Sequence, residues 1–373
     1  MIIADALLEC WMREYYFDAQ IDLGSSGVQS FSLAELRNIL GIRQEELDGI
    51  VFQDSRTLGE ERLRQAIANR WGNGFREAVM VTHGSSEAIY LIMNALLRHG
   101  DEAVVMAPCY QQLYSIAESL GCKLRFWHLR SDQQFKPDVD GLKRLLSPRT
   151  RMVVVNFPHN PTGVSLSALD QERLISAVAE AGAYLVWDGA FADITYGSHP
   201  LPNPGGAYER SISIGTLSKA YGLPGLRVGW AMASPDVLAQ FERLRDYITL
   251  HLSPLIELIA LRAIEKADAL LKIRLEHVKR NLEILTQWAA EHVGFVEWSR
   301  PQGGVCTFPR LCTVSNVEEF CRHLTLNQGV LLVPGNCFNH PMHVRLGFGT
   351  DTASFQEGLA RLSYKLKDSV NTW

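Results

Sequence analysis

The sequence predicts an α/β fold, with a large domain built on a mostly parallel β-sheet and a smaller α+β domain after it. Two observations carry this prediction. Between about residues 77 and 235, short apolar runs alternate with amphipathic stretches of helical spacing. Several of these runs are apolar throughout, as expected for strands that helices cover on both faces. The length of 373 residues also favours two domains over one small core.

The expected elements follow in chain order. The first part, residues 1–45, is expected to form an arm and a helix that join the small domain. In the large domain, 46–255, strands are expected over 102–107, 123–128, 151–157, 184–188, 211–215 and 228–232. Helices are expected between them, over 85–98, 111–120, 139–146 and 168–181. The linking helix and small domain occupy 256–373.

Around this last boundary, long helices are expected over 234–250 and 256–290, separated near Pro254 because helices usually end before a proline. Beyond Gly294 the pattern becomes strand, helix, two strands and a helix, over 295–298, 317–327, 329–333, 343–348 and 354–370.

Composition excludes several classes of function. The net charge of −5 gives no basic excess for binding nucleic acid. The seven cysteines are scattered and lack Cys-x-x-Cys spacing, which favours reduced thiols over a disulfide frame or a metal site. The N-terminus lacks a signal-peptide pattern, and no segment reaches the ~20 apolar residues that span a membrane. We therefore expect a cytoplasmic protein that binds no metal, nucleic acid or membrane.

The most informative segment is Gly-Thr-Leu-Ser-Lys-Ala-Tyr-Gly-Leu-Pro-Gly-Leu-Arg, at 215–227. Lys219 lies between two hydroxyl residues, Thr216 and Ser218, and Arg227 follows eight residues later. A lysine amine can bind an aldehyde covalently, and hydroxyls with a guanidinium can hold a phosphate. This segment predicts a site for pyridoxal phosphate (PLP).

Two earlier segments suit the same cofactor. Gly84, Ser85 and Ser86 follow an apolar run and open a helix, whose N-terminal amides can bind an anion. A plain helix cap is the alternative, since serine is favoured there. Tyr110 follows a strand end, where an aromatic ring can stack on a flat cofactor or simply pack in the core.

Three further polar residues stand at strand ends or on strands. Asn160 lies in Asn-Pro-Thr-Gly, a rigid turn that could present its amide to a phenolate oxygen or be an ordinary turn. Asp188 ends an apolar strand and could pair with a protonated pyridine nitrogen. Arg345 lies on an apolar strand, where its planar fork suits a substrate carboxylate, with a structural ion pair as the alternative.

Together these residues resemble, in order and approximate spacing, fold type I PLP-dependent enzymes of the aminotransferase class I/II superfamily. The resemblance covers nearly the whole chain. It implies a seven-stranded sheet and a homodimer with active sites at the subunit boundary. It also implies that Lys219 binds PLP and moves the substrate α-proton, with Asp188 on the ring nitrogen, Asn160 on the ring oxygen and Tyr110 stacked on the ring. The phosphate would be held by Gly84, Ser85, Ser86, Thr216, Ser218 and Arg227, and the α-carboxylate by Arg345. Phe191 stands where many members carry a tyrosine that donates to the ring oxygen.

Within this superfamily, the segments at 82–88, 154–161, 187–191 and 216–230 are similar to capreomycidine synthase and related hydroxyarginine cyclases of natural-product biosynthesis. This resemblance implies dehydration of a hydroxylated L-arginine and addition of its guanidine, with γ-hydroxyarginine giving enduracididine as the favoured reaction. Glu9 is the expected guanidinium partner, with an exposed helix glutamate as the alternative, and Ser25 and Gly27 are expected on the same side. An ordinary aminotransferase and a PLP-binding regulator without activity remain the other hypotheses.

Overall fold

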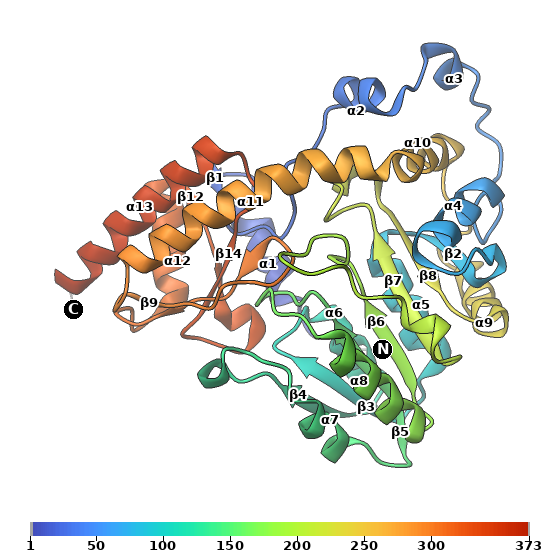
Figure 1. Cartoon of the computed structure of the whole chain (residues 1–373), viewed down its shortest axis with the longest axis horizontal. Helices are drawn as coiled ribbons and strands as arrows, with labels where there is room; N and C mark the ends of the chain where they lie inside the picture. The colour runs from blue at the N-terminus through green and yellow to red at the C-terminus, as the bar shows by residue number, and fades with distance from the viewer. Residues whose placement is uncertain (1–2, 372–373) are drawn as a thin grey trace.

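The computed structural model describes residues 3–371, and its centre is a seven-stranded sheet (Figure 1). The strands lie in the order β2-β8-β7-β6-β5-β3-β4. Only β8 runs antiparallel to its neighbours, so the prediction of a mostly parallel sheet is confirmed. The strand bounds are β2 (Val79–His83), β3 (Glu102–Ala107), β4 (Lys123–His128), β5 (Thr150–Asn156), β6 (Tyr184–Asp188), β7 (Ser211–Thr216) and β8 (Val228–Met232).

Helices cover both faces of this sheet. Alternate strand residues, such as Val104 and Val105, belong to two different buried clusters. One cluster packs against α5 (Gly84–Leu96), α6 (Gln112–Ser119) and α9 (Pro235–Arg245). The other packs against α4 (Glu61–Trp71), α7 (Val139–Leu145), α8 (Ala168–Glu180) and α10 (Pro254–Glu265). The uninterrupted apolar runs of the sequence are thus strands buried on both sides.

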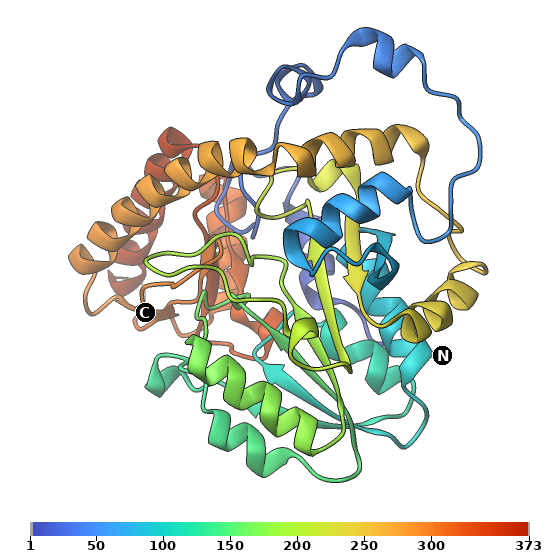
Figure 2. The ribbon, with the colours of Figure 1, turned by 45° about the vertical axis from the view of Figure 1, so that its right-hand side comes forward.

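The C-terminal part combines short strands with helices. Its elements are β9 (Val296–Glu297), β10 (Cys306–Thr307), β11 (Arg310–Leu311), α12 (Val317–Gln328), β12 (Val330–Leu331), β13 (Val333–Pro334), β14 (Val344–Gly347) and α13 (Thr352–Asn371). The helix α11 (Ala267–Glu291) runs from the large sheet to this part (Figure 2). Short 3₁₀ turns cover Arg76–Ala78, Ser131–Gln133, Pro204–Gly206, Pro224–Leu226 and Gly335–Phe338.

The N-terminal segment contains α1 (Leu7–Tyr15), β1 (Ile21–Asp22), α2 (Leu33–Leu40) and α3 (Gln44–Asp48). The strand β1 pairs in parallel with β12, so the start of the chain completes the C-terminal β-structure. In Figures 1 and 2, α2 and α3 lie on an outlying loop. No helix within residues 3–371 has the length and apolarity needed to cross a bilayer.

Some element boundaries differ from the prediction. The helix expected over 256–290 is two helices, because Lys266 leaves helical geometry at φ −112° and ψ 20°. The helix expected over 234–250 ends at Arg245, whose carbonyl accepts from the backbone amides of Ile248, Thr249 and Leu250. The strand expected over 329–333 is divided between β12 and β13, and β10 and β11 were not predicted.

Candidate functional site

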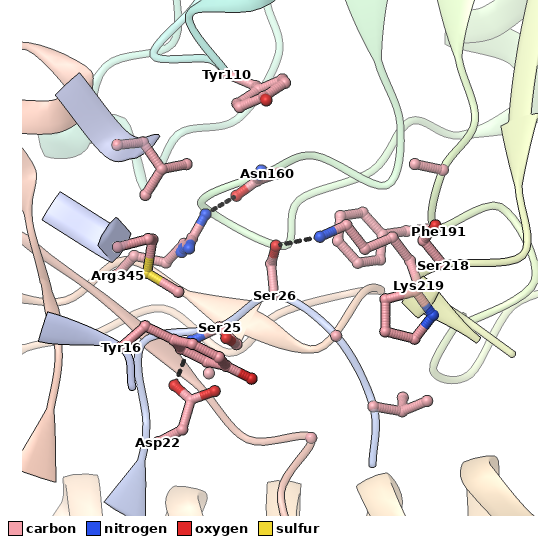
Figure 3. Close-up of a pocket in the computed structure, with 18 of the residues that line it drawn as sticks. Tyr16, Asp22, Ser25, Ser26, Tyr110, Asn160, Phe191, Ser218, Lys219 and Arg345 are labelled. Atoms are coloured by element: carbon pink, nitrogen blue, oxygen red, sulfur yellow. Dashed lines mark hydrogen bonds between the residues drawn. The ribbon is translucent and has the colours of Figure 1, made fainter. Parts of the chain in front are cut away.

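A cavity of about 590 Å³ lies where the N-terminal arm and β14 meet the carboxyl ends of β5, β6 and β7 (Figure 3). We define the arm as residues 21–30. Parallel α/β sheets place their chemistry at this edge. Most of the predicted site residues line the cavity: Glu9, Ser25, Gly27, Ser85, Tyr110, Asn160, Asp188, Phe191, Ser218, Lys219 and Arg345.

Lys219 lies on the connection between β7 and β8, with its amine in the cavity. Its Nζ donates to the Ser26 Oγ of the arm at 3.1 Å (Figure 3). Burial lowers the pKa of the amine to about 8, and the positive charge of Arg345 adds to this effect. A lysine with such a pKa supplies a useful fraction of neutral amine near pH 7, as both a nucleophile and a base require.

Asp188 ends β6 and is buried. Its Oδ1 accepts from the backbone amide of Ala190 at 3.0 Å. Burial raises the pKa of the carboxyl to about 6, although this hydrogen bond and Lys219 oppose the shift. No direct ion pair to Asp188 occurs among residues 3–371, so a cationic N–H group can still reach its carboxylate. A protonated pyridine nitrogen would be such a group.

The N-terminus of α5 lies beside the β7–β8 connection and is a candidate site for an anion. Gly84 has φ +72°, and a Cβ there would lie 2.6 Å from Arg227 Nη2. The glycine therefore allows the guanidinium to approach the helix amides, which together favour a phosphate. Ser85 and Ser218 line the cavity beside this point.

Four residues predicted for the phosphate do not line the cavity: Gly84, Ser86, Thr216 and Arg227. Thr216 is buried, and its hydroxyl is already hydrogen-bonded within the protein. It donates to the Val228 carbonyl at 2.9 Å and accepts from the Ser218 amide at 3.1 Å. Thr216 thus helps to fix the backbone of Ser218, which does line the cavity. Arg227 is exposed, with φ +54°, and its Nη1 donates to the Pro224 carbonyl.

Asn160 and Arg345 contact each other across the cavity (Figure 3). Arg345 is buried and donates from Nε to the Gly24 carbonyl at 2.9 Å and from Nη1 to Asn160 Oδ1 at 3.4 Å. The Cys306 thiol also donates to this oxygen, at 3.7 Å. Because Oδ1 faces these donors, the Asn160 Nδ2 is left to donate to a negative oxygen. Among the described residues, Arg345 Nη2 has no protein acceptor, so it can bind a carboxylate.

Tyr110 and Glu9 both line the cavity and are hydrogen-bonded to each other. The Tyr110 hydroxyl donates to Glu9 Oε1 at 2.8 Å, which places the half-buried carboxylate inside the cavity. Burial and the neighbouring Glu9 charge raise the pKa of Tyr110 well above its ordinary value, so its hydroxyl stays protonated. The phenyl ring of Phe191 is buried against the same cavity and offers no polar atom.

Sequence reasoning missed the roles of Ser26, Asp22 and Cys306. Asp22 Oδ1 accepts from the amides of Gly24 and Ser25, at 2.8 Å each, and so shapes the arm. Ser25 and Gly27 were expected at the site, yet nothing in the sequence could show that the hydroxyl between them, that of Ser26, faces Lys219. The collected residues fit PLP: the Lys219 amine could bind its aldehyde, the buried carboxylate of Asp188 could face its ring nitrogen, and the N-terminus of α5 could hold its phosphate.

Comparisons with known proteins agree with this geometry. Residues 33–362 match the family described as aminotransferase class I and II. Capreomycidine synthase of Streptomyces vinaceus is 46% identical over 365 residues, which cover 97% of this chain and 93% of that protein. The arginine–pyruvate transaminase AruH of Pseudomonas aeruginosa is 27% identical over 82% of this chain and 80% of its own length. The solved structure of the PLP-dependent cyclase OrfR matches with a TM-score of 0.94 and 42% identity, covering 99% of this chain and 98% of the other.

Proposed function

The chain belongs to the aminotransferase class I and II family, and from this we propose a PLP-dependent hydroxyarginine cyclase. Its proposed reaction removes water from a hydroxylated L-arginine and closes a ring through the guanidine. We favour γ-hydroxyarginine as the substrate and enduracididine as the product. The observation that carries the proposal is the 46% identity to capreomycidine synthase over almost the whole chain.

The site residues divide the work of this reaction. When bound, PLP supplies an electron sink for the charge left by loss of the α-proton. Asp188 would keep its ring nitrogen protonated, and Asn160 would donate from Nδ2 to its ring oxygen. Lys219, whose pKa of about 8 leaves part of it neutral, would take protons from the substrate. Arg345 would hold the α-carboxylate through its remaining donor.

The guanidinium would lie toward Glu9, the carboxylate that Tyr110 already holds at 2.8 Å. Ser25 and Gly27 of the arm line the same cavity and complete this proposed end of the site. A planar guanidinium pairs well with a carboxylate and backbone carbonyls. Binding both ends of an arginine would bring the terminal nitrogen and the side-chain carbons close together, as ring closure requires.

The test is a direct comparison of products. Purified enzyme with PLP is incubated with β- and γ-hydroxyarginine in deuterated water, and the products are identified by mass spectrometry. A cyclic guanidino acid formed without a 2-oxo acid supports the proposal. Deuterium at Cβ supports the γ-route, because that route alone requires an extra proton transfer there. Formation of only the 2-oxo acid and pyridoxamine phosphate would contradict the cyclase.

The second candidate is an aminotransferase, which the 27% identity to an arginine–pyruvate transaminase favours. It would use the same cofactor residues, so the geometry does not separate the two reactions. A half-reaction assay does. Lasting conversion of the cofactor to pyridoxamine phosphate by arginine, reversed by pyruvate, would favour transamination.

We also propose that the chain acts as a homodimer. Exposed apolar side chains gather on two segments: Val51 and Phe52 on one, Tyr247 and Leu250 on the other. His251 Nε2 lies 3.1 Å from Asp54 Oδ1, which joins these segments. A second copy covering them would remove the apolar surface from water. Light scattering over a range of protein concentrations tests this proposal, and a monomer at micromolar concentration would contradict it.

A further inference from the structure

The hydroxyl of Ser26 is hydrogen-bonded to the Lys219 amine, and the proposed function above gives this hydroxyl no role. Lys219 Nζ donates to Ser26 Oγ at 3.1 Å. Ser26 is 4% exposed and lines the cavity. Its own hydroxyl proton has no acceptor among the residues that the structure describes. The serine can therefore accept from the lysine and donate into the cavity at the same time.

Contacts with residues 345–349 hold the arm on both sides of Ser26. On one side, Leu23 accepts from the Gly347 amide at 2.8 Å and Gly24 accepts from Arg345 Nε. On the other, the Gln29 amide donates to the Gly349 carbonyl at 2.9 Å. Cβ atoms at Gly347 and Gly349 would lie 2.0 Å from the Ser25 carbonyl oxygen and 2.1 Å from that of Gly27. Ser26 thus lies between two close backbone contacts.

A dehydrating enzyme needs an acid for its leaving hydroxyl, because hydroxide is a poor leaving group. After Lys219 has taken a proton from carbon, its ammonium group can act as that acid. The leaving hydroxyl of a γ-hydroxylated substrate, however, is on a carbon two bonds beyond Cα. A hydroxyl hydrogen-bonded to the amine extends the reach of the lysine in the cavity by the length of that bond.

We propose that Ser26 is a proton relay from Lys219 to the hydroxyl that leaves the substrate. An N–H proton of the Lys219 ammonium passes to Ser26 Oγ, and the Ser26 hydroxyl proton passes to the substrate oxygen. The carbon–oxygen bond breaks, and its electron pair leaves with water. The pair left by deprotonation of the adjacent carbon forms the carbon–carbon double bond. Lys219 ends neutral, and Ser26 is unchanged. The relay rests on the proposed cyclase function.

The test separates proton removal from loss of water. The variant Ser26→Ala is compared with wild type for two rates, α-proton exchange in deuterated water and formation of the cyclic product. We expect α-exchange to stay within threefold and product formation to fall about 100-fold, as for loss of a general acid. Ser26→Thr should restore most of the product formation. Ser198→Ala, which removes an exposed hydroxyl away from the cavity, serves as the control.

A second readout needs no cofactor. In cofactor-free protein, the pKa of Lys219 is measured from the pH dependence of its acylation, followed by mass spectrometry. Ser26→Ala should lower this pKa by about one unit, because the ammonium loses a hydrogen-bond acceptor while Arg345, Glu9 and Asp188 remain.

Three results for Ser26→Ala would overturn the relay. The first is equal slowing of α-exchange and product formation, which would mean that Ser26 only orients Lys219. The others are no change in either rate, and no change in the pKa of Lys219. If Ser26→Ala fails to fold, Ser26→Gly replaces it, and product formation as fast as in Ser26→Thr would refute the proposal, because glycine has no hydroxyl that can pass a proton. Failure of the cyclase function itself is seen separately, as absence of cyclic product in wild type.

Discussion

Replacing Glu9 by glutamine tests the guanidinium end of the site. Glu9→Gln keeps an oxygen that can accept from Tyr110 but removes the negative charge. A hydrogen bond between charged groups contributes about 1.5–3 kcal/mol. Because Glu9 is only half-buried, solvent screens its charge, and the lower part of that range, about 1.5–2 kcal/mol, applies. Since about 1.4 kcal/mol is tenfold, KM for hydroxyarginine should rise about 10–30-fold.

The assay compares substrates with and without a guanidinium. The KM for α-proton exchange is measured by NMR in deuterated water with hydroxyarginine and with norleucine. Glu9→Gln should weaken binding of hydroxyarginine and leave norleucine within twofold. Glu14→Gln, an exposed carboxylate on the same helix, is the matched control and should change neither value. Equal weakening of both substrates, or no weakening of hydroxyarginine, would refute the assignment of Glu9.

Three other predictions concern the cofactor lysine, the arm and Asp188. Borohydride reduction should attach PLP to a peptide containing Lys219, and Lys219→Ala should show no attachment; labelling of the variant would contradict the covalent role. Gly347→Ala should lower the free energy of unfolding by about 1–3 kcal/mol, because its Cβ would lie 2.0 Å from the Ser25 carbonyl oxygen, whereas Gly206→Ala, with no atom within 4 Å, should be nearly neutral in denaturant titrations. In cofactor-free protein, burial raises the pKa of Asp188 from 3.8 in the unfolded chain to about 6 in the folded one. Between these pH values the folded chain binds more protons than the unfolded chain, so the free energy of unfolding falls as the pH rises from about 4 to about 6. Asp188→Asn should lack this fall of about 3 kcal/mol, and an identical pH profile for variant and wild type would refute the shift.

Strand positions were predictable because strands buried on both faces are continuous apolar runs. Tyr184–Asp188 and Val228–Met232 have the predicted ends in the structure. The direction of a strand leaves no such mark, so the reversal of β8 could not be predicted from its apolar run. The break at Lys266 was also hidden, because helix-forming residues continue across it.

The candidate site was predictable where a residue type has few other reasons to occur at a strand end, as for Asp188 and Lys219. Contacts between distant segments were not predictable. Ser26 and Lys219 are 193 residues apart, and the sequence does not show which arm hydroxyl turns inward. Thr216 was expected on the phosphate, but the sequence could not show that its hydroxyl is used by the Val228 carbonyl.

The reversal of β8 has one further consequence. Because β7 and β8 are antiparallel neighbours, a single connection returns the chain from one to the other and carries Ser218, Lys219 and Arg227. The lysine proposed for the aldehyde end of the cofactor and two of the residues proposed for its phosphate, Ser218 and Arg227, therefore share one connection of the chain. An insertion or deletion in this connection would therefore move the residues for both ends of the cofactor at once.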